Sequence, residues 1–432
     1  MTIAERDRAK QNPYQFLLNA VDRASHAAGT FEYMRSHAVL DCARFALVLL
    51  TAAACERPPA ETYGFVATLG NDTTSVERVT RTGDRVVSDA VGRSPVVVRR
   101  HWEATLAPDG SVRHWTMDTY VPNAVPDAMH LHHTADFTDR AVRLSRRVER
   151  ETTFAYARRY PITVPWNAFV YGTYELLFDA ATVNHADRVR IGQYFFEGWD
   201  EGHVGYADVR RIDDSTYSIQ STGLAGTGVA HIGAHGRLLS YSGQGTTYKQ
   251  EVRRVGRPPD VDAIAARFAA EEKRAGVSRE LSPRDTARGR IGSVAVAVDY
   301  GRPLRRGRVL LGGLIPYGQV WRTGANAATQ LSITAPMRVA GVRLDSGTYT
   351  LWTLPSADRV QLIVNRQTGQ WGTSYGSECD VARVIMRSDS VPSNVERFTI
   401  RVESEAPRGD AGRLVMEWGT LHWSVPLVAA ER

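Results

Sequence analysis

The sequence predicts an all-β protein: an N-terminal antiparallel meander or half-barrel with one helix, a linker helix, and a C-terminal antiparallel β-sandwich. The chain has 432 residues, which is too long for one ordinary domain. Its 36 Gly, 19 Pro, 17 Tyr and 9 Trp are typical of many short strands joined by tight turns. Hydrophobic residues at 43% and charged residues at 23% exclude a disordered chain and a polytopic membrane protein.

The first apolar segment of the chain resembles an export signal. Residues 45–54 form a run of about ten apolar or small residues, roughly half of what a membrane-spanning helix needs. Met34 and Arg35 precede this run as a short basic start, and three alanines lead directly to Cys55. Small residues before a cysteine resemble the lipobox of bacterial lipoproteins, so we expect Cys55 to be lipidated.

This interpretation predicts the cellular location of the protein. We expect residues 1–33 to be a non-translated or disordered extension and residues 34–54 to be a signal peptide. The protein would then be exported to the cell envelope and held at the membrane by its lipid anchor, facing the periplasm or exterior. The alternative keeps Met1 as the start and makes residues 36–54 a buried helix. Under export only one thiol, Cys379, remains free, so no internal disulfide can form.

Residues 61–255 are predicted to form the N-terminal antiparallel β domain. Turn signals such as Pro-Asp-Gly-Ser at 108–111 separate alternating segments such as Val96–Trp102. One apolar stretch, Trp166 to Val183, interrupts this pattern and predicts a helix laid against or through the sheet.

A helix and a polar segment are expected to join the two domains. Residues 259–276 predict a helix, since Asp260 can cap it and an apolar stripe follows at helical spacing. The stripe indicates docking onto a neighbouring domain. The polar, unpatterned residues 277–290 predict a linker, and alternating strands from 291 to 428 predict a compact antiparallel sandwich.

The C-terminal third carries a string of glycines, tryptophans and polar residues that resembles a known family. The string comprises Tyr300-Gly-Arg-Pro303, Leu311 to Thr329 with Gly-Gly, Trp-Arg and Asn inside it, Asp345 to Pro355, Asn365, Trp371-Gly372 and Asp380-Val-Ala-Arg383. Over roughly residues 280–428 this resembles the bacterial extracytoplasmic domain of unknown function 2911. The resemblance implies an all-β domain behind an export signal and carries no activity. The N-terminal region has no such resemblance.

The same string contains the candidate ligand-binding residues. Trp321, Arg322 and Asn326 place an aromatic face, a planar five-donor guanidinium and an amide in one short loop. Such a set suits carbohydrate, carboxylate or phosphate recognition. The remaining candidates are Tyr300, Arg302, Trp371, Asp380 and Arg383. The alternative is that Arg322 and Asp380 form a buried structural pair and the tryptophans fill the core.

Two catalytic patterns are present. Gly372-Thr-Ser374-Tyr-Gly376 matches the nucleophile pattern G-x-S-x-G, with Asp380 and His422 following in a usable order. That chemistry needs a strand–turn–helix in an α/β sheet, which this region does not predict.

The second pattern is the imidazole cluster His130-Leu-His132-His133. In a strand, His130 and His132 share a face and could chelate a metal, whereas the alternative is a solvated strand face. No third ligand has a matching spacing.

We therefore expect a non-catalytic binding module for a glycan, lipid or other small ligand, with no cofactor. The alternative is an extracytoplasmic hydrolase, either metal-dependent through the 130–133 histidines or serine-based through Ser374. The net charge of +6 is spread as arginines interleaved with acidic residues, with no basic block, so we expect no nucleic-acid partner.

Overall fold

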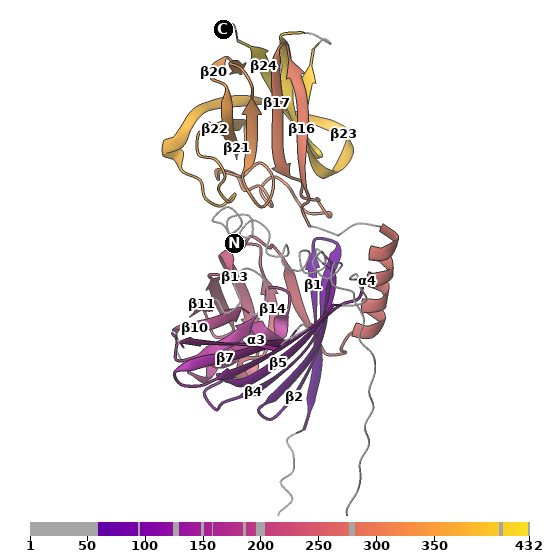
Figure 1. Ribbon diagram of the computed structural model, residues 1–432, viewed down its shortest axis with the longest axis vertical. Helices are drawn as coiled ribbons and strands as arrows, with labels where there is room; N and C mark the ends of the chain where they lie inside the picture. Colours follow the sequence, from indigo (N-terminus) through magenta and orange to yellow (C-terminus); the bar gives the residue numbers. More distant parts are fainter. Residues whose placement is uncertain are drawn as a thin grey trace, which may run out of the picture.

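The protein consists of two β-rich domains (Figure 1). The structure, a computed structural model, describes residues 59–93, 96–123, 129–147, 151–157, 159–184, 187–195, 204–275, 281–405 and 409–430. The predicted extension, signal peptide and Cys55 lie outside the described residues. The all-β prediction is confirmed. Within the described ranges, neither α-helix is long and apolar enough to cross a membrane.

The N-terminal domain is one 15-stranded sheet. Its strands, in chain order, are β1 (Glu61–Leu69), β2 (Asp72–Thr82), β3 (Arg85–Arg93), β4 (Val97–Leu106), β5 (Val112–Val121), β6 (Met129–Phe137), β7 (Ala141–Arg147), β8 (Glu151–Ala157), β9 (Thr163–Trp166), β10 (Arg188–Phe195), β11 (Val204–Arg211), β12 (Thr216–Ser221), β13 (Leu224–Ile232), β14 (Leu238–Ser242) and β15 (Glu251–Val255). A short 3₁₀ turn, η1 (Ala234–Gly236), precedes β14.

The neighbouring strands of the sheet are consecutive in the chain, except at one long-range seam where β1 pairs with β15. Its spatial order is β8-β7-β6-β5-β4-β3-β2-β1-β15-β14-β13-β12-β11-β10-β9. The neighbouring pairs are antiparallel except β9 with β10, which is parallel. The strands β8 and β9 are the two ends of this order, so the domain is the half-closed sheet that the meander pattern predicted.

Helix α3 (Tyr171–Val183) lies against this sheet (Figure 1), and its residues from Tyr171 to Ala181 are all buried. Its sequence is apolar around most of its circumference, which is what a fully buried helix needs. Gly110 makes the close approach possible, because a Cβ there would lie 2.8 Å from Ala180 Cα and its φ is +79°. The predicted interruption is thus confirmed as a helix, although Trp166 at its expected start belongs to β9.

Helix α4 (Val261–Ala275) begins where Asp260 Oδ1 accepts a hydrogen bond from the Ala263 amide, 3.0 Å. Its apolar stripe, including Val261, Ala265 and Phe268, packs against valines of β2, β3 and the start of β4. The predicted docking of this helix is therefore confirmed, and its partner is the N-terminal domain.

The predicted linker is wrong in its second half. Residues Arg284–Ile291 form β16, which pairs along its whole length with β17. The strand is polar because it lies at the edge of its sheet with half of its residues exposed, so it lacks the apolar alternation of a buried strand.

The C-terminal domain is a nine-stranded sheet in the order β16-β17-β18-β21-β22-β23-β24-β19-β20. Its further strands are β17 (Val294–Gly301), β18 (Thr329–Ile333), β19 (Met337–Val339), β20 (Val342–Leu344), β21 (Gly347–Pro355), β22 (Val360–Asn365), β23 (Asp380–Ser404) and β24 (Ala411–Ala429), with a 3₁₀ turn η2 (Ser377–Cys379). Because the strands β23 and β24 are long, the sheet folds back on itself. As a result, β16 and β17 pack on the late part of β23. The Tyr300 hydroxyl of β17, for example, accepts a hydrogen bond from the Ile400 amide, 2.9 Å. This is the predicted sandwich.

The two domains contact each other at the turn between β1 and β2. The Asn71 amide donates to the Arg306 carbonyl, 3.0 Å, and Arg306 Nε lies 2.9 Å from Asp72 Oδ2. Gly70 is required in this turn, because a Cβ there would overlap the Arg306 backbone and its φ is +60°.

Candidate functional site

Arg322 lies in the long irregular connection between β17 and β18, where several of the predicted ligand residues meet. The backbone of Trp321 pairs with Thr353 of β21 through hydrogen bonds of 2.7 and 2.9 Å. The Gly372 amide donates to the Asn326 carbonyl, 2.9 Å, which joins this loop to the one that carries Trp371. The site is thus built from two loops held by backbone pairing.

The side chain of Arg322 is partly buried and lies over Gly372. A Cβ at position 372 would overlap Arg322 Cδ, so only glycine leaves room for this side chain. Burial lowers the pKa of Arg322. Among the described residues, no hydrogen-bond acceptor or carboxylate is paired with its guanidinium, although Arg carries five N–H donors. An arginine in this state is unusual, because a buried cation is costly without a partner.

Lys249 of the N-terminal domain has arginine charges in its surroundings. The charges of Arg322 and Arg308, together with burial, lower the pKa of Lys249 in the N-terminal domain. Arg308 donates its Nε and Nη2 to the carbonyls of Arg305 and Leu304 at 2.9 and 2.6 Å. Lys249 donates to the Gln244 carbonyl, 2.9 Å.

Trp321 does not face a ligand surface. Its ring stacks on Trp418 at 5.9 Å and meets Phe398 and Trp423 edge-on at 5.3 and 6.5 Å. The reason is the alternation of an extended segment, in which neighbouring side chains point to opposite sides. Since the side chain of Arg322 lies over Gly372, the side chain of Trp321 points to the opposite side, into the sandwich core. These contacts favour the alternative that Trp321 fills the core, and its ligand role stays a prediction.

Asp380 and Arg383 form their own cluster. Arg383 donates to Asp380 Oδ2 through Nε and Nη2 at 2.9 and 2.7 Å, and the Tyr375 hydroxyl donates to the same oxygen at 2.7 Å. Asn365 Nδ2 donates to Asp380 Oδ1, 2.9 Å. The alternative of an Arg322–Asp380 pair is therefore wrong, because the carboxylate of Asp380 is taken by Arg383.

The other predicted ligand residues have structural contacts. Arg302 forms an ion pair with Asp285, 2.8 Å, and donates to Thr399 Oγ1, 2.9 Å, while the Tyr300 ring packs edge-on against Phe398. Asn326 is exposed, with a positive φ of 63° and its side chain 3.5 Å from the Ser282 carbonyl. Of the eight predicted ligand residues, Arg322, Asn326 and Trp371 come together.

The serine-hydrolase arrangement does not assemble. His422 Nδ1 is engaged by Glu417 Oε1 at 2.9 Å, and His422 pairs across the ladder with Asp389. Asp380 precedes Asp389 by nine positions on β23, about 30 Å of extended strand. Ser374 lies before the start of that strand, in an exposed turn.

The histidine cluster gives no described metal centre. His132 Nδ1 pairs with Asp118 Oδ1 at 2.8 Å, which matches the solvated-face alternative. The side chain of His130 lies outside what the structure describes. In the described ranges, no group of three or more His, Cys, Asp or Glu side chains could hold a metal ion.

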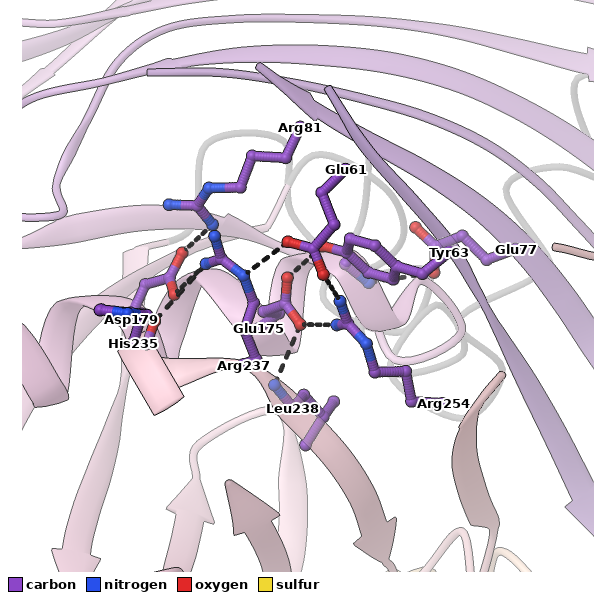
Figure 2. Close-up of polar contacts among 11 residues, drawn as sticks. Glu61, Tyr63, Glu77, Arg81, Glu175, Asp179, His235, Arg237, Leu238 and Arg254 are labelled. Carbon is purple, nitrogen blue, oxygen red and sulfur yellow. Dashed lines mark hydrogen bonds and ion pairs between the residues drawn. The ribbon is translucent and has the colours of Figure 1, made fainter. Parts of the chain in front are cut away.

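The densest set of buried charges lies elsewhere, on helix α3 (Figure 2). Glu175 Oε2 accepts from Arg254 Nη1 at 2.8 Å and from the Leu238 amide at 3.0 Å, and Glu175 Oε1 accepts from the Tyr63 hydroxyl. Arg254 also lies over the ring of Tyr63 at 3.3 Å and pairs with Glu61.

One turn further along the helix, Asp179 completes the same network. It is held by Arg81 and by Arg237 Nη1, the latter at 3.1 Å, and Arg237 Nε reaches Glu61 at 3.2 Å. Three arginines thus face three carboxylates, here called the α3 ion network (Figure 2). Each carboxylate is engaged on both oxygens or by two arginines, so the network anchors the helix and offers no free group for chemistry.

Burial and the neighbouring Asp179 raise the pKa of Glu175 to about 7, in spite of its cationic partners. No motif in the sequence predicts this network. Its only local signal is the pair Glu175 and Asp179, two acids one turn apart in an otherwise apolar helix. Their partners come from β1, β2, β14 and β15.

The C-terminal sandwich matches one family model, described as "Protein of unknown function (DUF2911)", over residues 282–427. The N-terminal region matches no family model, which agrees with the resemblance stated from the sequence. No curated protein matches the chain.

Two solved structures resemble part of the chain at low similarity. One is a DUF1089 family protein from Pseudomonas aeruginosa, with 15% identity, a TM-score of 0.29, and coverage of 45% of this chain and 97% of that one. The other is a β-barrel-like protein of domain of unknown function DUF1849 from Brucella abortus, with 10% identity, a TM-score of 0.31, and coverage of 46% and 95%.

Proposed function

We propose that this protein is a non-catalytic binding protein for a small anionic ligand, or for the anionic group of a glycan or lipid, and that Arg322 recognises it. The observation that carries the proposal is the partly buried Arg322 side chain, whose guanidinium has no acceptor or carboxylate paired with it among the described residues. Leaving a charge buried without a partner costs several kcal/mol, on the order of what removing one partner of a buried pair costs. A carboxylate or phosphate would offset this cost through two parallel hydrogen bonds.

The surroundings of Arg322 favour binding over catalysis. Gly372 leaves room beside the guanidinium, and half-buried Trp371 provides an apolar surface next to it. Burial alone shifts the pKa of Arg322, and the described contacts bring no general acid or base onto it. A site of this kind holds an anion.

The test is isothermal titration calorimetry with inorganic phosphate and with acetate, at constant ionic strength, on the full chain. The Arg322→Gln variant keeps much of the side-chain volume and removes the charge, and it should lose measurable binding of the preferred anion. Arg288→Gln, on the exposed edge strand β16, is the matched control and should bind as the unmodified protein does. Equal binding by the Arg322→Gln and Arg288→Gln proteins would remove the basis of the proposal.

We also propose that the chain is exported and lipid-anchored at Cys55. The support is the order of a basic start, a short apolar run and a small-residue approach to cysteine within residues 34–55. Protein expressed from Met34 in a bacterial host and extracted from membranes should show, on denatured mass measurement, a chain that begins at a lipidated Cys55. A Cys55→Ser variant should stay uncleaved. If the chain of the unmodified protein still begins at Met34, the proposed export and lipidation at Cys55 are contradicted.

A further inference from the structure

We propose that Thr323 and Thr329 are positioning residues for Arg322. The Thr329 hydroxyl holds Thr323 in a left-handed backbone conformation, and this conformation keeps the Arg322 side chain over Gly372 before a ligand arrives. This inference rests on the proposed function and adds the residues that fix its binding side chain. It is carried by an unusual backbone angle directly after Arg322 and by the buried contacts that maintain this angle.

Thr323 has a backbone conformation that its side chain disfavours. Its φ is +50°, in the left-handed region, where the Cβ of an L-residue crowds the following carbonyl oxygen. Of the six non-glycine residues with positive φ in the described chain, Thr323 is the one with a β-branched side chain. Asn326 has a φ of +63°, but asparagine tolerates this region. A glycine at position 323 would adopt the same φ without strain.

The buried hydroxyl of Thr329 maintains this conformation. Thr329 is the first residue of β18, and its Oγ1 donates to the Thr323 carbonyl at 2.7 Å. Both residues are 0% exposed, so this hydrogen bond is costly to break. Gly324 leaves room for it, because a Cβ there would lie 3.0 Å from Thr329 Oγ1. The Thr323 peptide is therefore held from the strand that follows the loop.

Trp321 fixes the chain on the other side of Arg322. The Trp321 amide donates to the Thr353 carbonyl at 2.7 Å, and the Thr353 amide donates back to the Trp321 carbonyl at 2.9 Å. Arg322 thus lies between two anchored residues, so the backbone sets the direction of its side chain. If Thr323 relaxed to a negative φ, the peptide that joins it to Arg322 would turn, and the side chain would leave Gly372.

The strain at Thr323 favours a role in binding over a role in folding alone. Strained backbone persists only where its surroundings over-determine it, and it is concentrated at ligand sites. The left-handed threonine lowers the stability of the folded chain, which a glycine would not do. In return, the rotation of Arg322 is already restricted when an anion arrives, and a long side chain that must be immobilised on binding weakens the affinity.

The experiment measures binding of inorganic phosphate to the full chain by calorimetry at constant ionic strength. Thr329→Val keeps the shape of the side chain and removes the donor. It should weaken phosphate binding about threefold to tenfold, because Arg322 must then be immobilised when the ligand binds. Thr334→Val, just beyond the other end of β18, is the matched control, since it also removes a hydroxyl bonded to the backbone, at 2.9 Å from the Ala295 amide. Its dissociation constant should stay within about twofold of that of the unmodified protein.

A rescue variant separates positioning from a merely structural role. Glycine at position 323 needs no clamp, so Thr323→Gly combined with Thr329→Val should bind phosphate more tightly than Thr329→Val alone, within about twofold of the unmodified protein. Thermal melts of each variant in phosphate-free buffer report whether the fold is retained. If Thr329→Val alone is unfolded, the combined variant should fold and bind within about twofold of Thr323→Gly. A combined variant that is also unfolded overturns the inference.

The outcomes distinguish this inference from the proposed function. If Arg322→Gln loses phosphate binding and Thr329→Val keeps it unchanged, the Arg322 site stands and the positioning role is overturned. If Thr329→Val weakens binding and Thr323→Gly does not restore it, the hydroxyl acts by another route and the inference is overturned. If Arg322→Gln binds phosphate as the unmodified protein does, or if the unmodified protein binds neither phosphate nor acetate, both proposals are overturned.

Discussion

Trp321 and Arg322 are neighbours in the chain with opposite environments. The extended backbone between them sends one side chain into the sandwich core, against Trp418 and Phe398, and the other over Gly372. Trp321 therefore contributes to the free energy of unfolding, and Arg322 is the residue that we propose for ligand binding.

Trp321→Ala should lower the free energy of unfolding of the C-terminal domain by about 3 kcal/mol, because it leaves a cavity among aromatic rings. Trp371→Ala, whose ring has no described aromatic contact, should cost clearly less. Denaturant unfolding followed by tryptophan fluorescence and circular dichroism measures both. If Trp321→Ala is no more destabilising than Trp371→Ala, the core role of Trp321 is wrong.

Gly372→Ala tests the room that Arg322 needs. The added Cβ would lie 2.5 Å from the Asn326 carbonyl oxygen and overlap Arg322 Cδ, so we expect a loss of about 1–3 kcal/mol and displacement of the guanidinium. Gly256→Ala, with nothing within 4 Å of its Cβ position, is the control and should be close to neutral. Urea unfolding gives the free energies, and loss of anion binding by Gly372→Ala alone reports the displacement.

Sequence reasoning found part of this site. Arg322, Asn326 and Trp371 stand out because they belong to one unusual string of glycines and polar residues. Trp321 was assigned to the ligand because composition does not tell which side of a strand a side chain occupies.

At the scale of elements, α3 depends on charges supplied by the sheet around it. Its N-terminal amides are capped by Glu77 of β2, whose Oε2 accepts from the Tyr171 and Gly172 amides at 2.6 and 3.0 Å. The Ser88 hydroxyl donates to Glu77 Oε1 at 2.6 Å. This carboxylate is fully buried and sits at the positive end of the helix dipole.

Glu77→Gln should destabilise the N-terminal domain by about 2–4 kcal/mol, because buried donors lose a charged acceptor and the new amide faces them. Glu103→Gln, which alters a partly exposed pair with Arg85 on the same sheet, should cost less than about 1 kcal/mol. Chemical denaturation of the two variants in parallel measures the two losses in the free energy of unfolding. Equal losses would show that the cap formed by Glu77 is unimportant.

The α3 ion network predicts a dependence of stability on pH. The pKa of Glu175 is about 7 in the folded protein against an ordinary 4.5, so the folded state binds this proton more tightly than the unfolded chain. Its contribution is therefore fully present below about pH 4.5 and is lost as the pH rises through about 7. By linkage the loss amounts to about 3 kcal/mol.

Melting curves from pH 5 to pH 8 test this dependence. The unmodified protein should lose stability across that window relative to Glu175→Gln, which has no proton to release. Groups such as Asp89, with a pKa of about 2, titrate below the window, and the raised pKa of His101 affects both proteins alike. If the stability of the two proteins changes with pH in the same way, the prediction that folded Glu175 binds a proton near pH 7 is contradicted.

The elements were predictable where burial and periodicity agree. Helix α4 shows its apolar stripe and cap in the sequence, and α3 shows an apolar stretch longer than a strand. The edge strand β16 was taken for linker because exposed strands carry no alternation to read. The α3 ion network was out of reach, since Arg81 and Asp179 are brought together only by the curvature of the whole sheet.

At the scale of the molecule, the domains are joined by the contact between the β1–β2 turn and the loop at Arg306. The Arg306 side chain is 8% exposed and the Asp72 side chain 50% exposed, so their ion pair is partly shielded from water. A double-mutant cycle of Asp72→Ala and Arg306→Ala should give a coupling energy of about 1 kcal/mol in the unfolding of the less stable domain. The exposed pair Arg387 and Asp389, treated in the same way, should give close to zero. Equal couplings for the two pairs would mean that the boundary contact adds nothing.

The seam between β1 and β15 has a consequence for how the protein reaches this structure. Every other neighbour in the N-terminal sheet is close in sequence, so β2 to β8 and β10 to β14 can each form as soon as they leave the ribosome or the translocation channel. The pairing of Val66 with Arg253 instead closes a loop of nearly the whole domain. Assembly should thus proceed as two fast local meanders followed by one slow step that pairs β1 with β15. Until that step, α3 cannot contact its arginine partners on both sides of the seam at the same time.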